Sequence, residues 1–267
     1  MNTFDINYLK NKNFHENDKG TSLNEETHIY NIQGVYDYTS MTTFIHSLFN
    51  TFDADKIITN MMNSKNWVNS KYYGMTREKI KELWDKNKIN ASENGTNMHL
   101  NIEKFYNGAT IVDESIEWLY FMKFYQDYKD KLEPYRTEWI VYDKEIKIAG
   151  SIDMIFKTKP EKIIDDKEVI DIYDWKRCKD ITKVSSFNKW AVNPLISHIP
   201  DTNYWHYAFQ LNGYKWILEH NYNKIIRDMY LVCLHPDNNN KSYKLIKIPD
   251  LQEEINILFE ERKMNIN

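Results

Sequence analysis

Two short motifs, Gly150-Ser-Ile-Asp153 and Asp174-Trp-Lys176, hold the residue types best suited to chemistry. Side chains alternate between the two faces of a strand, so Asp174 and Lys176 project from one face and Trp175 from the other. If Asp153, near the end of the preceding strand, lies alongside, two carboxylates converge on one point with a lysine about 6–7 Å along the strand. Such oxygen ligands suit Mg²⁺, and a metal there could activate water for attack on a phosphodiester. The motifs therefore predict a magnesium-dependent phosphodiesterase site.

The second motif also has a simpler interpretation, because most Asp-x-Lys triplets on strands are solvent-facing charges. Here Asp174 follows the largely apolar run 169–173. A carboxylate and a lysine in apolar surroundings cost free energy unless they have partners or a function. Lysine is a poor base because its ordinary pKa is high. We therefore expect Lys176 to orient the attacking water or to offset charge on the phosphorus.

The elements that must position these residues change in character along the chain. Up to residue 131 the hydrophobic spacing is mainly that of helices, after a hairpin at Ile29–Tyr38 that turns through Gln33-Gly34. The predicted helices begin near Met41, where Ser40 or Thr42 is the cap, and then cover Arg77–Asn87, Ser92–Tyr106 and Asp113–Lys131.

Beyond residue 131 the period falls to about two, which indicates strands. The order of elements, β-β-β-α-β and a last helix, predicts an α/β fold with a mixed central β-sheet flanked by helices. With 267 residues and 42% hydrophobic content, we expect one domain, in which residues 1–131 are mainly helical and 132–267 form the core. The predicted elements are strands 135–142, 146–156 and 169–176, helix 203–220, strands 229–234 and 243–248, and a helix from Pro249.

Composition limits the class of protein. The net charge of −4 argues against a strongly basic nucleic-acid binder, although carboxylates of a metal site count as negative until the metal binds. The 2 cysteines, Cys178 and Cys233, cannot form a disulfide framework, a four-cysteine zinc site or an iron–sulfur cluster. The N-terminus lacks a signal-peptide pattern, and no apolar run approaches a membrane span. We expect a soluble intracellular protein without a membrane partner.

Two further motifs place the chemistry in a family. The sequence resembles the RecB-like branch of the PD-(D/E)xK nucleases, which includes the RecB and AddB nuclease domains, lambda-type exonucleases and mitochondrial genome-maintenance exonucleases. The matching motifs stand in the family's order: Gly95-Thr-Asn-Met-His99-Leu-Asn-Ile-Glu103, Gly150-Ser-Ile-Asp153, Asp174-Trp-Lys176 and Gln210-Leu-Asn-Gly-Tyr214. The resemblance covers about residues 95 to 220 and implies a restriction-endonuclease-like core.

The resemblance also implies a ligand set. His99, Asp153, Asp174 and the backbone carbonyl of Trp175 would bind the metal, while Asp153, Asp174 and Lys176 would be catalytic. Mg²⁺ would be the cofactor, and a histidine nitrogen among oxygen ligands makes Mn²⁺ a good substitute. Taken alone, a histidine on a helix is more often structural. The motif around His99 reverses that preference.

Four other residues would support the site or contact the substrate. Glu103 lies one helical turn from His99 and could hydrogen-bond it. Glu138, in Arg136-Thr-Glu-Trp, is either a supporting residue or part of the polar face of the sheet. Gln210 and Tyr214 share a helical face, and a packing role for Tyr214 competes equally with a nucleic-acid contact.

Basic residues follow the catalytic strand and could track a phosphate backbone, with Phe187 and Trp190 stacking on bases. The alternative is a solvated surface. The basic residues are Arg177, Lys179, Lys183 and Lys189.

Together these features predict a metal-dependent deoxyribonuclease, an exonuclease in DNA repair, recombination or replication. Its partner would be single- or double-stranded DNA, or RNA, and no oligomer interface can be read from the sequence. The alternatives are a structure-specific endonuclease and a non-catalytic nucleic-acid-binding subunit. The Asn-, Lys- and Ile-rich composition indicates an AT-rich genome, such as that of a large DNA virus, which would place the protein in the cytoplasm or in a virus factory.

Overall fold

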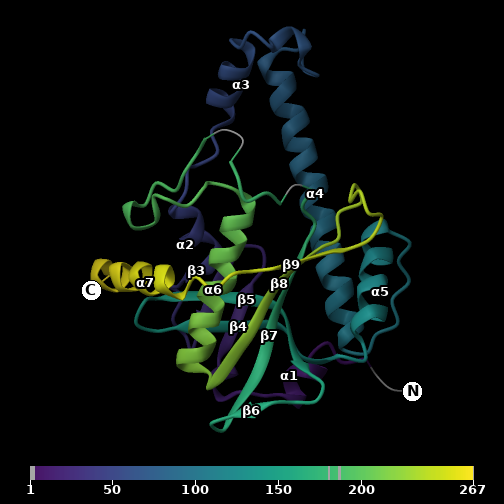
Figure 1. Cartoon of the computed structure of the whole chain (residues 1–267), viewed down its shortest axis with the longest axis vertical. Coiled ribbons are helices and arrows are strands. Elements are labelled where there is room, and N and C mark those ends of the chain that lie inside the picture. Colours follow the sequence, from purple (N-terminus) through teal and green to yellow (C-terminus); the bar gives the residue numbers. More distant parts are fainter. Residues whose placement is uncertain (1–3, 180, 186–187, 267) are drawn as a thin grey trace. The chain divides into compact units, whose positions relative to one another are not determined.

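The computed structural model describes residues 4–179, 181–185 and 188–266. The chain divides into two compact units, one made by Met1–Asn50 with His99–Asn267 and one by Thr51–Met98. The first unit contains a curled mixed sheet flanked by helices (Figure 1), which confirms the predicted α/β class. None of the described helices is long and apolar enough to cross a membrane.

The sheet combines parallel and antiparallel neighbours. β7 is parallel to β8, and β3 to β5, whereas β5 is antiparallel to β4 and β7, β6 to β7, and β8 to β9. The five strand runs predicted after residue 131 are confirmed as β4, β5, β7, β8 and β9. The strands are β3 (Thr39–Ser40), β4 (Leu132–Asp143), β5 (Ile148–Thr158), β6 (Ile163–Ile164), β7 (Lys167–Lys176), β8 (Lys224–Cys233) and β9 (Lys244–Lys247).

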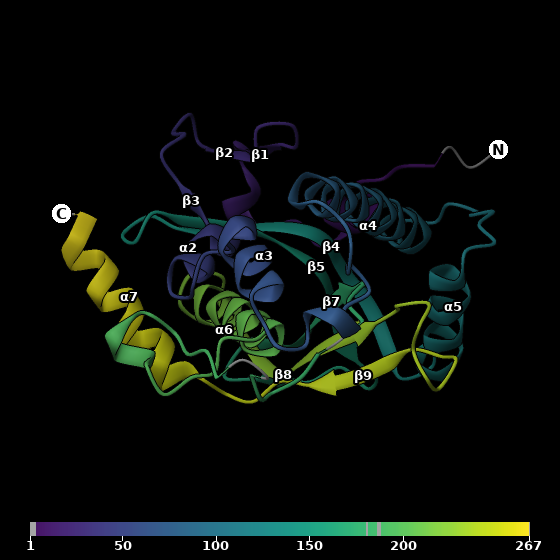
Figure 2. The same cartoon turned by 90° about the horizontal axis from the view of Figure 1, so that it is seen from above.

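Helices cover both faces of β7, so its residues 169–175 are all buried, including two aspartates. On one face, the ring of Trp175 lies 5.6 Å from that of Phe121 and 5.4 Å from that of Phe124, both on α5 (Ile116–Tyr128). On the other face, Lys176 lies over Tyr207 of α6 (Asn203–Asn221). Figure 2 shows β7 between these two helices. The predicted alternation of Lys176 and Trp175 is thus confirmed.

The main core lies where α6 packs on the sheet. Leu211 and Ile217 of α6 are fully buried with Ile172 of β7 and Leu231 of β8. Three smaller helices complete this core: α2 (Met41–Ser47), η3 (Pro194–Ile196) and α7 (Gln252–Ile266). Ser40 caps α2, as predicted, by accepting a hydrogen bond from the Thr43 N–H at 3.0 Å.

The predicted hairpin at Ile29–Tyr38 is wrong. β2 (Ile29–Ile32) pairs instead with β1 (Thr21–Asn24), which precedes it. Gln33 and Gly34 do form a tight turn, with φ of 55° and 87°, but only one bridge, Ile32 to Val35, follows it. The turn at Gln33-Gly34 is confirmed, but the strand that pairs with β2 comes before it in the sequence and not after it. α1 (Tyr8–Lys12) and η1 (Glu16–Asp18) precede this hairpin.

Two helix boundaries also differ from the prediction. α4 (Arg77–Tyr106) is one continuous helix where two were expected. Gly95 lies within this helix, where a glycine costs only about 1 kcal/mol relative to alanine. α5 begins after Ser115, which caps it, and not at Asp113. The Asp113 carboxylate instead accepts the Ser115 N–H at 2.7 Å.

The second unit holds α3 (Ala54–Met62), η2 (Trp67–Asn69) and the first part of α4. Ile58 and Ile80 are fully buried in it. The indole N–H of Trp84 donates to the hydroxyl of Tyr72 at 2.9 Å, and the two rings pack edge to face.

Candidate metal-binding and catalytic site

His99, Glu138 and Asp153 meet at one point of the first unit. They come from the last turns of α4, from β4 and from β5, and each offers a ligand atom within 4.8 Å of the others. The Nδ1 atom of His99 lies 3.5 Å from Asp153 Oδ2 and 4.0 Å from Glu138 Oε1. Two carboxylates and one imidazole at these separations could hold a divalent cation.

Glu138 has an unusual backbone for a strand residue. Its φ is 42°, in the left-handed region that non-glycine residues rarely adopt. Its neighbours Thr137 and Trp139 pair regularly with Met154 and Ile152, so Glu138 faces Asp153 across the two strands. The Ser151 hydroxyl donates to Glu138 Oε2 at 2.8 Å and fixes the carboxylate. Backbone strain of this kind costs about 1–3 kcal/mol and is concentrated at functional sites.

Asp153, in the middle of β5, contacts the backbone near the end of β7. It follows directly in register after the pair Met154–Tyr173, and its Oδ2 accepts the backbone N–H of Trp175 at 2.9 Å. Burial raises the pKa of Asp153, and the positive charges of His99 and Lys176 act in the opposite direction. For His99 burial opposes the charged form, but Asp153 and Glu138 still raise its pKa to about 9.

Asp174 and Lys176 form a buried ion pair beside this group. The Lys176 Nζ lies 2.9 Å from Asp174 Oδ1 and 2.7 Å from Oδ2, although only the first contact has hydrogen-bond geometry. Burial, followed by the charge of Asp153, raises the pKa of Asp174 to about 6 against the attraction of Lys176. Asp174 thus carries an incompletely compensated negative charge in the interior.

The predicted metal ligands stay a prediction, and the structure adds one candidate to them. It brings His99, Asp153 and Asp174 into electrostatic contact, as expected. The tightest group, however, contains Glu138 in place of Asp174. Sequence reasoning ranked Glu138 as a supporting residue because a single glutamate on a strand gives no further signal. The Trp175 carbonyl as a ligand stays a prediction.

Glu103 does not hydrogen-bond His99 in the described part of the chain. The imidazole lies instead beside the strand carboxylates, with its Nδ1 atom 3.5 Å from Asp153 and 4.0 Å from Glu138. Glu103 is half-buried, and burial, followed by the charges of Glu138 and Glu25, raises its pKa to about 7. It therefore adds to the acidic character of the site without orienting the histidine.

The ring of Tyr214 packs closely against the backbone at position 150, which explains the glycine there. A Cβ atom added at Gly150 would lie 2.5 Å from Cε1 of Tyr214, so only glycine allows this approach. Tyr214 is 3% exposed, and its hydroxyl accepts a hydrogen bond from Gln210 at 3.2 Å. Gln210 also donates to Thr42 Oγ1 at 3.3 Å. Of the two roles open for Tyr214, the contacts match packing, which fixes α6 against β5 just before Asp153.

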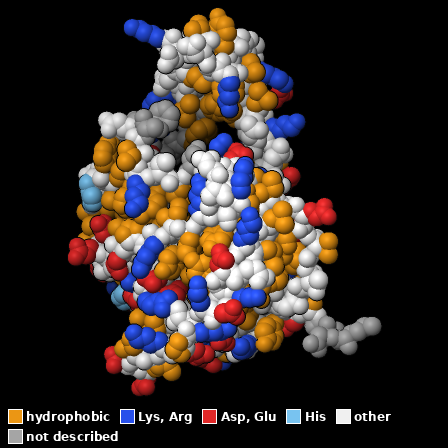
Figure 3. Space-filling model, turned by 45° about the vertical axis from the view of Figure 1, so that its right-hand side comes forward, with side chains coloured by type: hydrophobic (Ala, Val, Ile, Leu, Met, Phe, Trp, Pro, Cys, Tyr) orange, Lys and Arg blue, Asp and Glu red, His pale blue; other side chains and the backbone are white. Residues whose placement is uncertain are grey.

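The basic residues predicted to contact nucleic acid differ in burial and in their partners. Arg177 forms a largely buried ion pair with Glu117, whose Oε1 is 2.5 Å from its Nε. Lys179 pairs with Asp237, and Lys183 lies over the ring of Tyr204. Lys189 is exposed, and Phe187 is outside the described residues. On the face shown in Figure 3, basic and acidic side chains are interspersed, and the contact with nucleic acid stays a prediction.

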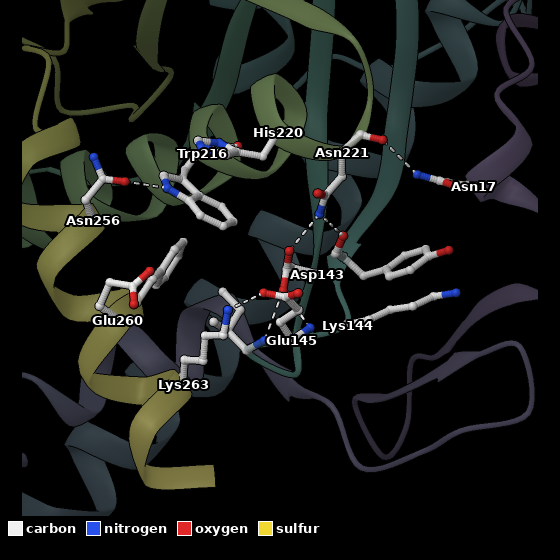
Figure 4. A pocket seen from close by; sticks show the side chains of 13 residues that line it. Asn17, Asp143, Lys144, Glu145, Trp216, His220, Asn221, Asn256, Glu260 and Lys263 are labelled. Carbon is white, nitrogen blue, oxygen red and sulfur yellow. Dashed lines mark hydrogen bonds and ion pairs between the residues drawn. The ribbon is translucent and has the colours of Figure 1, made fainter. Parts of the chain in front are cut away.

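A cavity of about 610 Å³ lies elsewhere in the first unit, between the C-terminal end of α6, the β4–β5 turn and α7. Figure 4 shows that its polar groups bind one another: the Trp216 indole N–H donates to Asn256 at 2.6 Å, and Lys263 pairs with Glu145 at 2.5 Å. None of the predicted site residues lines this cavity. The candidate chemistry is therefore separate from it.

Comparison with known proteins adds little. No protein-family model matches this chain, and no curated protein matches it. A solved structure described as "Crystal structure of SSO0001" is similar with a TM-score of 0.34 and 14% sequence identity, over 87% of this chain and 77% of that chain. A likeness at that level carries no argument, so the function must be argued from the site.

Proposed function

We propose that this protein is a divalent-metal-dependent nuclease that hydrolyses phosphodiester bonds of DNA, acting as an exonuclease. The observation that supports it most is the convergence of His99, Glu138 and Asp153 within 4.8 Å, with the Asp174–Lys176 pair beside them. The choice of DNA and of an exonuclease follows the resemblance to the RecB-like branch. A role in DNA repair, recombination or replication, and an intracellular location, belong to the same proposal.

The residues fit a hard divalent cation. Glu138, Asp153 and Asp174 supply carboxylates, while Lys176 pairs with Asp174 and its charge acts on Asp153. Asp174 Oδ2 is buried without a hydrogen bond, and its raised pKa reflects unfavourable burial of negative charge. His99, Glu138 and Asp153 would hold Mg²⁺ or Mn²⁺, with Asp174 adjoining. Such an ion lowers the pKa of bound water and polarises a phosphate.

The protein's own groups have separate tasks in this scheme. The Trp175 N–H holds the Asp153 carboxylate, and Ser151 holds that of Glu138, so both are oriented before a ligand arrives. Asp174 fixes the ammonium group of Lys176 close to them. From there Lys176 can offset the negative charge that develops on the phosphate oxygens.

A cleavage assay tests the proposal. End-labelled linear DNA, single- and double-stranded, is incubated with Mg²⁺ or Mn²⁺ beside covalently closed circles. We expect the linear substrates to be degraded, the circles to survive and EDTA to stop the reaction. Linear DNA that persists with both metals contradicts a nuclease. Cutting of the circles would replace the exonuclease with an endonuclease.

A further inference from the structure

Lys176 must be held in place, because a lysine carries its charge on a flexible four-carbon stem. Two groups contact its ammonium: the carboxylate of Asp174 and the ring of Tyr207. The Nζ atom lies 4.7 Å from the centroid of the Tyr207 ring, within the range of a cation–π interaction. Tyr207 is on α6, one turn before Gln210.

The Tyr207 ring is itself fixed. Burial and then the neighbouring Cys178 raise the pKa of its hydroxyl, and the Asn203 amide donates to the Cys178 sulfur at 3.6 Å. The next two residues of α6, Ala208 and Phe209, are fully buried in the core. Because its neighbours on α6 are buried, the Tyr207 ring has a defined position, and the flexible side chain of Lys176 can pack against it.

We infer that Tyr207 is a positioning residue, whose ring face keeps the Lys176 ammonium beside Asp174 when that carboxylate also faces a metal cation. A cation held by His99 and Asp153 repels the ammonium and weakens its attraction to Asp174. The face of the Tyr207 ring also attracts the ammonium, and this attraction does not depend on the carboxylate that faces the metal. The inference rests on the proposed function, and it assigns to α6 a part in catalysis beyond packing.

The kinetic test compares Tyr207→Leu, which removes the ring face, with Tyr207→Phe, which keeps it. We expect Y207L to lower kcat roughly 2- to 30-fold with KM and Mn²⁺ affinity little changed, and Y207F to restore most of the loss. Tyr38→Leu is the matched control, because Lys147 lies 4.9 Å over that ring, outside the site. Equal kcat losses in Y207F and Y207L would overturn the inference, as would an unchanged kcat in Y207L.

A second readout does not depend on cleavage. The ring current of Tyr207 should shift the Hε resonance of Lys176 upfield in NMR spectra, and the resonance is assigned by its loss in Lys176→Arg. We expect the shift in the wild type and Y207F and its disappearance in Y207L. Should Y207L fail to fold, Tyr207→Met serves in its place. An inert wild type would refute the proposed nuclease, while a shift that is missing from the wild type would refute the contact.

Discussion

Strand β7 carries an ionised cluster at each end, and the two differ in how their charge is compensated. At its beginning, Glu168 contacts Lys157 at 2.6 Å, Lys224 and the hydroxyl of Tyr135. Burial opposes ionisation there, but hydrogen bonds from both lysines lower the pKa of Glu168 to about 2. At its end, Asp174 contacts one lysine and faces Asp153, and burial raises its pKa to about 6.

The difference separates a structural cluster from a candidate binding site. Two lysines for one carboxylate leave nothing for a ligand to neutralise. Three carboxylates face Lys176 and His99, whose pKa is raised to about 9, and an excess of negative charge remains even with both groups protonated. A divalent cation would relieve that excess. Burial acts in the same direction at both ends, so the number of cationic partners decides the outcome.

The largest effect should come from removing the charges at the Asp174 end. Asp174→Asn and Lys176→Ala are expected to lower the cleavage rate by roughly a hundredfold or more, because each removes a charge next to the reacting phosphate. Thermal melting should change little for Asp174→Asn, since burial already destabilises that carboxylate. Lys176→Ala should also lower the melting temperature, because it leaves the buried carboxylate without its lysine. The control is Glu168→Gln, which should keep cleavage. Full activity in Asp174→Asn would show that the site is elsewhere.

Glu168→Gln should affect stability instead. The pKa of Glu168 is about 2 in the folded protein and near 4.5 when unfolded, so its contribution is present above pH 4.5 and lost as the pH falls toward 2. We expect the variant to lose about 2 kcal/mol at pH 7, allowing for solvent screening. Urea unfolding at pH 7 and pH 3 measures this. An equal loss at both pH values would contradict the electrostatic explanation.

How much the sequence revealed depends on the range of the interactions involved. The positions of Asp174, Trp175 and Lys176 follow from strand alternation, which is local, and the mixed sheet follows from the order of elements. The Ser40 cap is equally local. The ion pairs of Arg177 with Glu117 and of Glu168 with Lys224 are not local, since the partners lie about 60 residues apart in sequence.

Glu138 shows the same limit at the site itself. Its inclusion among the ligand atoms depends on a left-handed backbone within β4, and no residue type in the motif requires that conformation. The hydrogen bond from Ser151 and the approach of His99 both depend on the assembled fold. Strand alternation thus places Asp174 and Lys176, whereas the approach of Glu138 to His99 and Asp153 could not be predicted from local sequence.

Gly150→Ala tests whether the Asp174 end depends on α6. The new methyl group would overlap Tyr214, and overpacking of this kind costs about 1–3 kcal/mol. We expect a lower unfolding free energy and weaker Mn²⁺ binding, because β5 carries Asp153. The pH range over which Glu168 contributes to the free energy of unfolding should stay unchanged. Adding Tyr214→Leu should recover part of the stability, and a double variant as unstable as the sum would rule out the contact.

The smallest change in stability is expected for Glu138→Asn. Asparagine tolerates a left-handed backbone better than glutamate, so the variant should be as stable as the wild type or more stable by up to about 1 kcal/mol. Its shorter amide cannot replace the carboxylate, and Mn²⁺ affinity should fall at least about tenfold. Calorimetric titration with Mn²⁺ and urea unfolding measure the two effects. Undiminished affinity would return Glu138 to a supporting role, whereas lost affinity with retained stability would show that strain at β4 is maintained for the metal.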